Sequence, residues 1–370
     1  MSDGENPQLG RQSLSKNFKN IFDYSGEKFL YVNFDKTFYI HISKQPSSEP
    51  LHVEGYPSIQ SAKDDKTVYL GTLIIQSPLV LNHVEANIKS RAFNVKKYHD
   101  WLDVNTDTPI VKKVEVLYMC MFAAITYGCE AWFCINDVSE ELLKIERTLL
   151  KRILGVRNTT PNDLVYIEFG IPDIISKIKK RQANFFNKMQ NLEYSEALVR
   201  SILDMCVNLP CYRYYLDIDP NVVESNIRNR RHDVLSSEST YSTRYSTIVG
   251  FQYCDALYNL PMIECYRTAI TRWRLSNHKL RIETGRYCRP KIPRNERKCM
   301  TCNVVEDEDH VLFSCVLYDS IRVKYEDVVA RRNTIHLLLN PVTTDDACKV
   351  GSFILEVELY RSDNGLDCVQ

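Results

Sequence analysis

The chain has 370 residues and no formal net charge, because 47 basic residues balance 47 acidic residues. This balance excludes a chain that binds polyanions over its whole surface, so any nucleic-acid surface must be local. Only 12 glycines are present, which disfavours a nucleotide-binding fold built on glycine-rich loops.

The cysteine content and the lengths of the apolar runs predict where in the cell the protein is located. Thirteen cysteines, an odd number, are scattered without the pattern of a small disulfide scaffold, and the first residues have no charged-then-apolar leader. Free thiols in a reducing compartment are therefore expected, with an intracellular location that is nuclear or cytoplasmic. The most apolar run, Val116 to Tyr127, is too short for a membrane span, and no membrane partner is expected.

The first predicted elements are strands. Residues 1–28 are polar and are expected to be a disordered or fraying terminus. Aromatic and β-branched residues dominate Phe29 to Ile42 and Thr67 to Ile75, which predicts two strands separated by the loop Pro46 to Pro57. Residues 29–76 would then form one small sheet.

Helices are predicted for residues 77–207. Gly155 and Gly170 are expected to end two of them, and Asp137 with Glu140 forms a plausible capping box. The predicted helices cover Leu79 to Tyr98, Ile110 to Tyr127, Asp137 to Leu154, Pro161 to Phe169, and one from Pro172 or Asp173 to about Leu192.

The last part of the chain is predicted to be less regular. Prolines and a Ser/Thr-rich run predict an irregular linker at 208–250. The segment 251–340 is expected to contain helix over 252–285, a metal-binding module, and a final helix from Tyr318 to Leu339. Residues 341–370 are expected to be a weakly ordered tail. The predicted fold class is therefore mainly α with a small β remnant, an α+β arrangement.

Four residues after position 298 have the spacing of a metal site. Cys299, Cys302, His310 and Cys315 form a C-x2-C-x7-H-x4-C array. A Cys-x2-Cys pair supplies two thiolates from one turn, and a nearby His and Cys can complete a tetrahedron around Zn²⁺. One structural zinc is predicted there. The acids between Glu306 and Asp309 are not needed as ligands and are expected to be solvated or to pair with nearby cations, namely Arg297, Lys298 or Arg322.

A basic tract leads into this array. From Arg267 to Lys298 eleven basic residues face only two acids, with aromatic residues interleaved. Cations can neutralise phosphates and aromatic faces can stack on unpaired bases, so RNA or DNA binding is predicted, although Trp273 is expected in the core. The predicted contact residues are Arg272, Arg274, Lys279, Arg281, Arg286, Arg289, Lys291, Arg294, Arg297 and Lys298.

Several short motifs occur in an order typical of one protein family. They are Leu30–Thr37, Tyr69–Gly71, Tyr127–Trp132, Leu150–Val156 and Pro161–Gly170, followed by Glu283–Tyr287 and Arg294–His310. Together they resemble the C-terminal portion of the reverse transcriptase of a non-LTR (LINE-type) retrotransposon. The resemblance covers about residues 10–325.

The resemblance implies roles for parts of the chain. Residues 29–76 would be a palm remnant with a primer-grip hairpin, in which Lys36 is the palm lysine and Tyr69, Leu70 and Gly71 form the hairpin. Residues 77–207 would be a helical thumb, and 251–340 a basic zinc-knuckle segment that binds nucleic acid.

The family's catalytic carboxylates have no counterpart. Its Ala-Asp-Asp palm motif would lie well before Asn33, at the very start of the given sequence, where only Asp3 stands. Asp64 and Asp65 are more readily explained as a solvated turn, so no catalytic residue and no Mg²⁺ are predicted. The expected function is a truncated reverse-transcriptase fragment that binds RNA or DNA without polymerising. Two alternatives stay open: an RNA-directed DNA polymerase subunit whose palm aspartates come from a missing segment, and a transposon relic without function.

Overall fold

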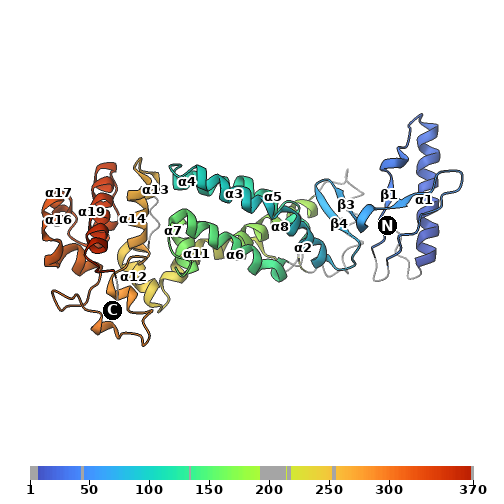
Figure 1. Cartoon of the computed structure of the whole chain (residues 1–370). Helices are drawn as coiled ribbons and strands as arrows, with labels where there is room; N and C mark the ends of the chain where they lie inside the picture. The colour runs from blue at the N-terminus through green and yellow to red at the C-terminus, as the bar shows by residue number, and fades with distance from the viewer. Residues whose placement is uncertain are drawn as a thin grey trace. The chain divides into compact units, whose positions relative to one another are not determined.

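The computed structural model describes residues 7–42, 46–132, 135–191, 214, 218–251 and 256–367. It is mainly helical, and in these ranges strands occur only between residues 38 and 75 (Figure 1). The chain divides into two compact units. Unit 1 comprises residues 1–94 with 124–138, and unit 2 comprises residues 95–123 with 139–370.

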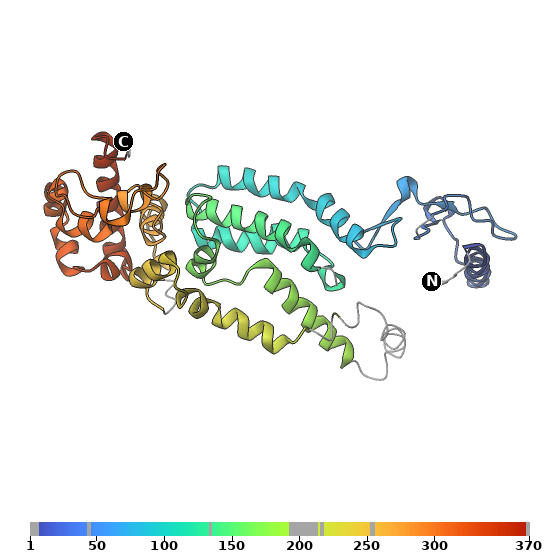
Figure 2. The ribbon, with the colours of Figure 1, turned by 90° about the horizontal axis from the view of Figure 1, so that it is seen from below.

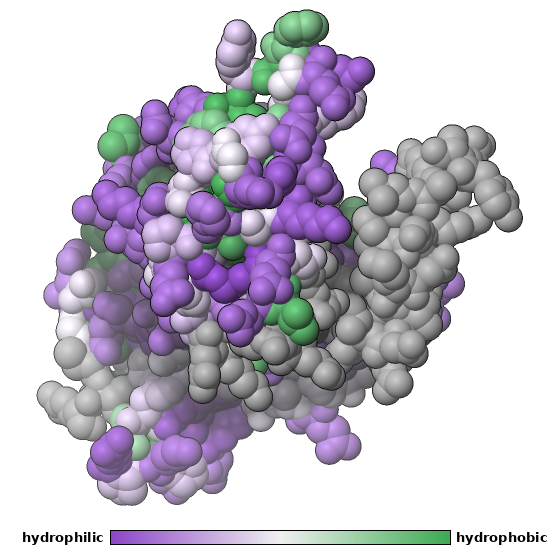
Figure 3. All heavy atoms as spheres, turned by 90° about the vertical axis from the view of Figure 1, so that its right-hand side faces the viewer, coloured by the Kyte–Doolittle hydropathy of each residue, from purple (hydrophilic) through white to green (hydrophobic). Residues whose placement is uncertain are grey.

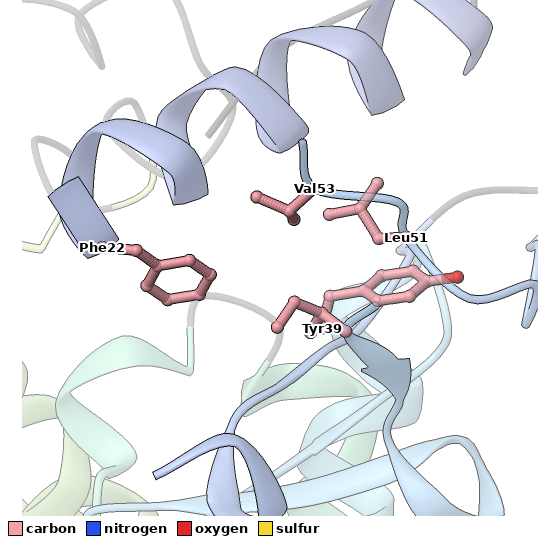
Figure 4. Packing of buried hydrophobic residues seen from close by; sticks show 5 residues of the cluster. Phe22, Tyr39, Leu51 and Val53 are labelled. Atoms are coloured by element: carbon pink, nitrogen blue, oxygen red, sulfur yellow. The ribbon is translucent and has the colours of Figure 1, made fainter. Parts of the chain in front are cut away.

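Unit 1 begins with a helix where disorder was predicted. Helix α1 spans Pro7–Glu27. Its Phe22 packs with Tyr39, Leu51 and Val53 in a small hydrophobic core (Figure 4). The polar composition of this segment misled the prediction, because Phe22 and the partly buried Leu14 and Phe18, four residues apart, form an apolar stripe that docks the helix. Residues 1–6 lie outside the described chain.

The strand predicted from Phe29 to Ile42 is largely wrong. Strand β1 covers only Phe38–Tyr39 and pairs in parallel with β2, Gln60–Ser61. Residues Phe34–Lys36 form a 3-10 turn, η1, capped by the Asn33 side chain. Phe29 and Tyr31 are exposed and belong to no strand, so only the end of the aromatic run pairs with another strand.

The second predicted strand is a hairpin. Strands β3 (Lys66–Tyr69) and β4 (Thr72–Ile75) pair antiparallel. Both turn residues have positive φ, 46° at Leu70 and 78° at Gly71, as a two-residue turn matched to the strand twist requires. This hairpin is separate from the β1–β2 pair, so the single sheet predicted is wrong. Asn87 holds the hairpin against helix α2 (Val80–Arg91) by bonding both the N–H and the C=O of Leu73.

Two short helical segments complete the described part of unit 1 beyond α2. They are α5 (Ala123–Ile125) and the 3-10 turn η4 (Cys129–Ala131). Another 3-10 turn, η2 (Lys63–Asp65), precedes the hairpin.

The helices predicted before residue 191 are largely confirmed. The elements are α3 (Phe93–Val104), α4 (Ile110–Val116), a π-helical segment η3 (Leu117–Phe122), α6 (Ile135–Leu154), α7 (Asn162–Phe169) and α8 (Ile174–Gln190). Helix α7 ends at Gly170 in the left-handed region, and Asp173 caps α8 by accepting a bond from the Ser176 N–H. Helix α6 starts two residues before Asp137, so the predicted capping box lies inside the helix.

A buried carboxylate fastens α6 to its neighbours. Glu146 accepts hydrogen bonds of 2.6 Å from the hydroxyls of Tyr118 and Tyr166, and one of 3.0 Å from the Ile174 N–H. Burial raises the pKa of Glu146, which these hydrogen bonds partly offset. The helical part of unit 2 is thus joined by polar contacts as well as by its apolar core.

The irregular linker predicted at 208–250 is wrong where the structure describes it. Helix α11 (Pro220–Leu235) starts with the Asp219 cap followed by proline at its first position, and α12 (Thr240–Val249) follows. The Ser/Thr-rich run forms α12 because Tyr245, Ile248 and Val249 lie on one buried face. Helices α8 and α11 pack side by side (Figure 2).

The weakly ordered tail predicted at 341–370 is also wrong. Helix α19 spans Thr344–Asp363 and packs along α14 (Glu264–Arg274) (Figure 1). The two helices approach closely at Gly351, where a Cβ atom would lie only 2.3 Å from the Cβ of Tyr266. Absence of a side chain at Gly351 therefore allows the contact.

The remaining helices are short. The helix predicted from Tyr318 to Leu339 is broken into α16 (Asp319–Lys324), α17 (Glu326–Arg331) and α18 (Ile335–Leu339), and the helix predicted over 252–285 is interrupted. Two further helices, α13 (Ala256–Asn259) and α15 (Arg281–Thr284), flank α14.

One face of the molecule carries few large apolar areas. The face shown in Figure 3 is mostly hydrophilic, and its hydrophobic side chains form small separate areas. Among the helices that the structure describes, none has both the length and the apolar composition that a membrane span requires.

Candidate metal centre and basic surface

A short hairpin presents the first two cysteines. Lys298 and Val305 form an antiparallel bridge, and the Cys299 N–H donates to the Val304 C=O at 2.7 Å. Asn303 has a φ of 57°, a left-handed conformation that asparagine tolerates well and that reverses the chain. The turn between the two short arms therefore carries both Cys299 and Cys302.

A second turn brings in the other two residues. Residues His310–Ser314 form a π-helical turn, η7, closed by a 2.7 Å bond from the Cys315 N–H to the His310 C=O. Arg322 of α16 donates to the carbonyls of Val311 and Cys315, which holds this turn in place. The x7 spacing between Cys302 and His310 thus spans the return arm of the hairpin and the entry to η7.

The predicted ligand atoms converge. The Cys315 Sγ lies 3.8 Å from both the Cys299 Sγ and the Cys302 Sγ, and the ligand atoms of all four residues lie within 4.8 Å of one another. Zn–S bonds of about 2.3 Å at tetrahedral angles place sulfur atoms about 3.8 Å apart. The His310 Nε2 is buried and has no hydrogen-bond partner, so it is free to act as a ligand. The cluster could hold a metal ion.

The protonation of this cluster follows from its burial. Burial lowers the pKa of His310, which favours the neutral imidazole that a metal binds. Burial, together with the adjacent Cys299 and Cys302, raises the pKa of Cys315 to about 12. Without a cation the thiol would stay protonated, and a bound cation would reverse this preference because thiolate is the ligating form.

In the ranges that the structure describes, this cluster is the one group of three or more His, Cys, Asp or Glu residues whose ligand atoms converge. Asp64 and Asp65 do not belong to such a group. They are exposed in the turn before β3 with φ values of 55° and 53°, and Asp65 accepts a bond from the Ser48 hydroxyl at 3.2 Å. The solvated turn expected for this pair agrees with these observations.

Two acids of the metal-binding loop are buried, contrary to the prediction that they are solvated. Glu306 lies 2.8 Å from Arg361 of α19. Glu308 lies 2.7 Å from Arg244 of α12 and 3.0 Å from the His278 Nε2. None of the cations predicted to pair with these acids is their ion-pair partner here.

These ion pairs fasten the loop to the helices. Burial opposes ionisation of Glu308, but His278 and Arg244 outweigh it and hold the pKa of Glu308 well below its usual range. Arg244, His278 and Arg361 were missed by the sequence prediction. Each is distant in sequence from the loop, and no local pattern identifies such a partner.

The first part of the basic tract is turned inward. Arg274 is 2% exposed, and its guanidinium lies 3.1 Å from the buried Glu168 carboxylate, which also accepts hydrogen bonds from the hydroxyls of Tyr245 and Tyr258. Arg274 was predicted to contact nucleic acid, and this prediction is wrong because its charge is enclosed and paired. Trp273 is fully buried, as expected, and its indole N–H donates to Glu358.

Other predicted contact residues are partly engaged. Lys279 is exposed but lies 2.8 Å from Asp367, and Arg272 donates to the Gly155 C=O at 2.6 Å. Arg297 donates to the carbonyls of Ile292 and Ile282 and so supports the loop from inside. Arg281 lies 3.9 Å from Glu306, and Arg286 lies 3.4 Å from Glu283.

The second part of the tract is turned outward. Four of its cations are exposed, and within the described ranges none of them has a side-chain hydrogen bond or an ion pair. They lie on the loop that leads into the metal centre, and we call them the basic loop: Arg289, Lys291, Arg294 and Lys298. Their charges are therefore available to a ligand.

The residues assigned by resemblance to a palm lie in unit 1. Lys36 is exposed in η1, and its backbone N–H donates to the Asn33 side chain. Tyr69 and Leu70 are exposed at the hairpin tip. Gly71 accepts a bond from Arg91 at 2.7 Å, and a Cβ there would meet the Tyr127 ring at 3.2 Å. The hairpin exists as expected, and its role stays a prediction.

No protein-family model, curated protein or solved structure matches this chain.

Proposed function

We propose that unit 2 contains a zinc-organised nucleic-acid-binding module, in a chain that resembles the C-terminal portion of a LINE-type reverse transcriptase. The basic loop carries this proposal. Its four exposed cations lie without partners in the described structure, immediately before the first metal ligand. The charge is confined to one part of a neutral chain, so the bound polyanion would meet a local surface.

Zinc is the metal that the ligand set favours. Three thiolates and one imidazole in a tetrahedral arrangement suit Zn²⁺, whereas Mg²⁺ and Ca²⁺ prefer oxygen ligands. Four protein ligands leave no open position, so the ion would serve structure rather than catalysis. When bound, it would supply free energy of folding to a loop that has little apolar core of its own.

The module would act on phosphates through charge. Each exposed cation that contacts a phosphate displaces a condensed counterion, and this release favours binding without reading sequence. Arg297 and the metal ligands would keep the loop from collapsing, which preorganises the cations. Polymerisation is not part of the proposal, because Asp64 and Asp65 lie in an exposed turn and two-metal catalysis needs carboxylates that converge on both ions.

The test is the salt dependence of binding. Purified chain should bind a labelled RNA or DNA oligonucleotide, with affinity that falls linearly on a log–log plot against salt. The double variant Arg289→Ala with Lys291→Ala should flatten the slope by about 1.4–1.8, since each lost phosphate contact removes about 0.7–0.9. Cys302→Ser should weaken binding by unfolding the loop.

The matched control is Lys16→Ala with Lys28→Ala, which removes the same charge from two exposed positions, one in α1 and one just after its end. The control should keep the wild-type slope. Binding that is insensitive to salt, or equal slopes for the basic-loop variant and wild type, would remove the nucleic-acid function. A primer-extension assay with Mg²⁺ should give no product, and extension that Asp64→Ala with Asp65→Ala abolishes would restore the polymerase alternative.

A further inference from the structure

Three hollows on the surface of unit 2 lie next to one another, because each shares lining residues with the next. The first, of about 410 Å³, is lined in part by Arg157, Arg272 and Lys279. The second is a small depression that shares Arg157 with the first and is also lined by Tyr241 and Tyr287. The third, of about 300 Å³, shares Glu283 with the second and is lined by Arg286 and Arg294. A path therefore runs from the turn after α6 to the basic loop.

An aromatic pair lies at the middle of this path. The Tyr241 and Tyr287 hydroxyls are 3.3 Å apart, and the Arg286 guanidinium lies 4.4 Å from the centre of the Tyr241 ring. These contacts hold Tyr287 while leaving 54% of it exposed. Trp273 is enclosed in the core, so Tyr287 is the residue of the basic tract best placed to offer an aromatic face to a ligand.

The charge along the path favours an anionic backbone. Most carboxylates that line it are neutralised: Asp367 by Lys279, Glu283 by Arg286 and Glu308 by Arg244. Arg157 and Arg272 contact only backbone carbonyls.

The guanidiniums of Arg157, Arg272 and Arg294 have no carboxylate partner in the described ranges. Two acids that line the path have no cation partner there: Glu358, which accepts from the Trp273 N–H, and Glu238, at the far end. Positive charge thus predominates in the first hollow, and the third, in which cations and acids balance, contributes the unpaired guanidinium of Arg294.

We infer that the ligand of this module is a single strand, whose sugar–phosphate backbone follows Arg157, Arg272 and Arg294 and one of whose unpaired bases stacks on Tyr287. This inference rests on the proposed nucleic-acid function and specifies its substrate. Bases in a duplex are already stacked and paired inside the helix, so they cannot meet a tyrosine face, whereas every unpaired base offers one.

The experiment compares one oligonucleotide in two forms. A labelled single strand and the same strand annealed to its complement are titrated against the full chain, at constant salt, for four proteins: wild type, Tyr287→Ala, Tyr287→Phe and Tyr24→Ala. The last removes an exposed tyrosine of α1 and is the matched control. Zinc content and far-UV circular dichroism establish that each variant is folded.

Wild type should bind the single strand more tightly than the duplex. Tyr287→Ala should weaken the single-strand complex by about five- to a hundredfold, the range for one base–aromatic stack, with little change for the duplex. Tyr287→Phe should restore the preference because it keeps the ring, and Tyr24→Ala should match wild type. Arg157→Gln should flatten the salt slope for the single strand by about 0.7.

Other outcomes separate the two claims. If Tyr287→Ala weakens neither form, or both equally, while the basic-loop variant still flattens the salt slope, the single-strand inference is wrong and the nucleic-acid function stands. If the basic-loop variant changes nothing for either form, the nucleic-acid function itself is wrong. If Tyr287→Ala fails to fold, 2-aminopurine placed along the strand decides with wild-type protein. Quenching at a single position supports stacking, and uniform fluorescence contradicts it.

Discussion

Arg274 and Arg294 belong to the same basic tract and carry the same charge in opposite surroundings. Arg274 lies on α14, enclosed and paired with Glu168. Arg294 lies on the loop before the metal centre, exposed and without a partner in the described ranges. A desolvated arginine needs its acid for the fold to be stable, whereas an exposed one costs nothing to leave unpaired. The first therefore contributes to the fold, and the second is available for function.

The spacing of residues explains why the two parts of the tract differ. Arg267, Ile270, Thr271 and Arg274 are buried at positions i, i+3, i+4 and i+7 of α14, which is the stripe that faces the core. The segment from Arg289 to Lys298 contains two prolines and no helical period. Counting basic residues treats the two parts as one tract. The helical spacing of the buried residues distinguishes α14 from the loop that follows it.

Breaking the buried pair should have the largest effect on stability. Arg274→Ala leaves the Glu168 carboxylate enclosed without its cation, and we expect a loss of about 3–5 kcal/mol in the free energy of unfolding. Urea denaturation followed by circular dichroism measures this, with Arg294→Ala as the matched control. Equal stability of the two variants would contradict the division of the tract.

Overpacking the contact between α14 and α19 should rank second. A Cβ at Gly351 would lie 2.3 Å from the Tyr266 Cβ, so Gly351→Ala must push the helices apart. We expect a loss of about 1–3 kcal/mol. Gly26→Ala, on α1 with no atom within 4 Å of the new Cβ, is the control and should be neutral or slightly stabilising. A neutral Gly351→Ala would show that α19 does not pack closely on α14.

The sequence predicted elements well where signals were local. Gly170 and Asp173 bound helices as expected because each side chain, or its absence, acts on its own turn. The tail after residue 341 was misjudged because α19 is held by distant partners, among them Tyr266 and Glu306. Residues of α12 were assigned to a linker on composition, although their buried face has a helical period.

The start of α19 should respond to acid. Asp346 pairs with Arg331 and Arg332. Burial opposes its ionisation, but the hydrogen bond and charge of Arg332 outweigh this and lower the pKa of Asp346.

The pKa of Asp346 is lower in the folded chain than in the unfolded chain, where it is about 4. Its charge therefore stabilises the fold at pH values above about 4, and this stabilisation disappears as the pH falls through the pKa of the folded chain. Asp346→Asn should therefore cost about 1 kcal/mol at pH 7, with the difference from wild type shrinking below about pH 4. A difference that is constant from pH 7 to pH 3 would show that the charge of Asp346 is not the cause.

The smallest effect on stability is expected at the basic loop. Lys291→Ala removes an exposed cation without a partner in the described ranges, so the free energy of unfolding should change by no more than about 0.5 kcal/mol. Thermal unfolding with and without the substitution tests this. A substantial loss would mean that Lys291 supports the fold, which would place it with Arg274 rather than with Arg294.

The site was predicted in part. The spacing of Cys299, Cys302, His310 and Cys315 is a local signal, and the structure brings these four residues together. The acids between them were placed wrongly, because Glu306 and Glu308 find partners on α19 and α12 that are distant in sequence. The outward cations were grouped with the inward ones because the prediction counted charge over the whole tract and did not use the helical spacing of its first part.

The central claim is that one zinc ion, held by the cysteine and histidine cluster, organises the basic loop. X-ray absorption at the zinc edge, with elemental analysis of chain purified without chelators, tests it most directly. The claim predicts one zinc per chain with three sulfur neighbours at about 2.3 Å and one nitrogen at about 2.0–2.1 Å. A chain without zinc, or one whose zinc has only oxygen and nitrogen neighbours, would contradict it.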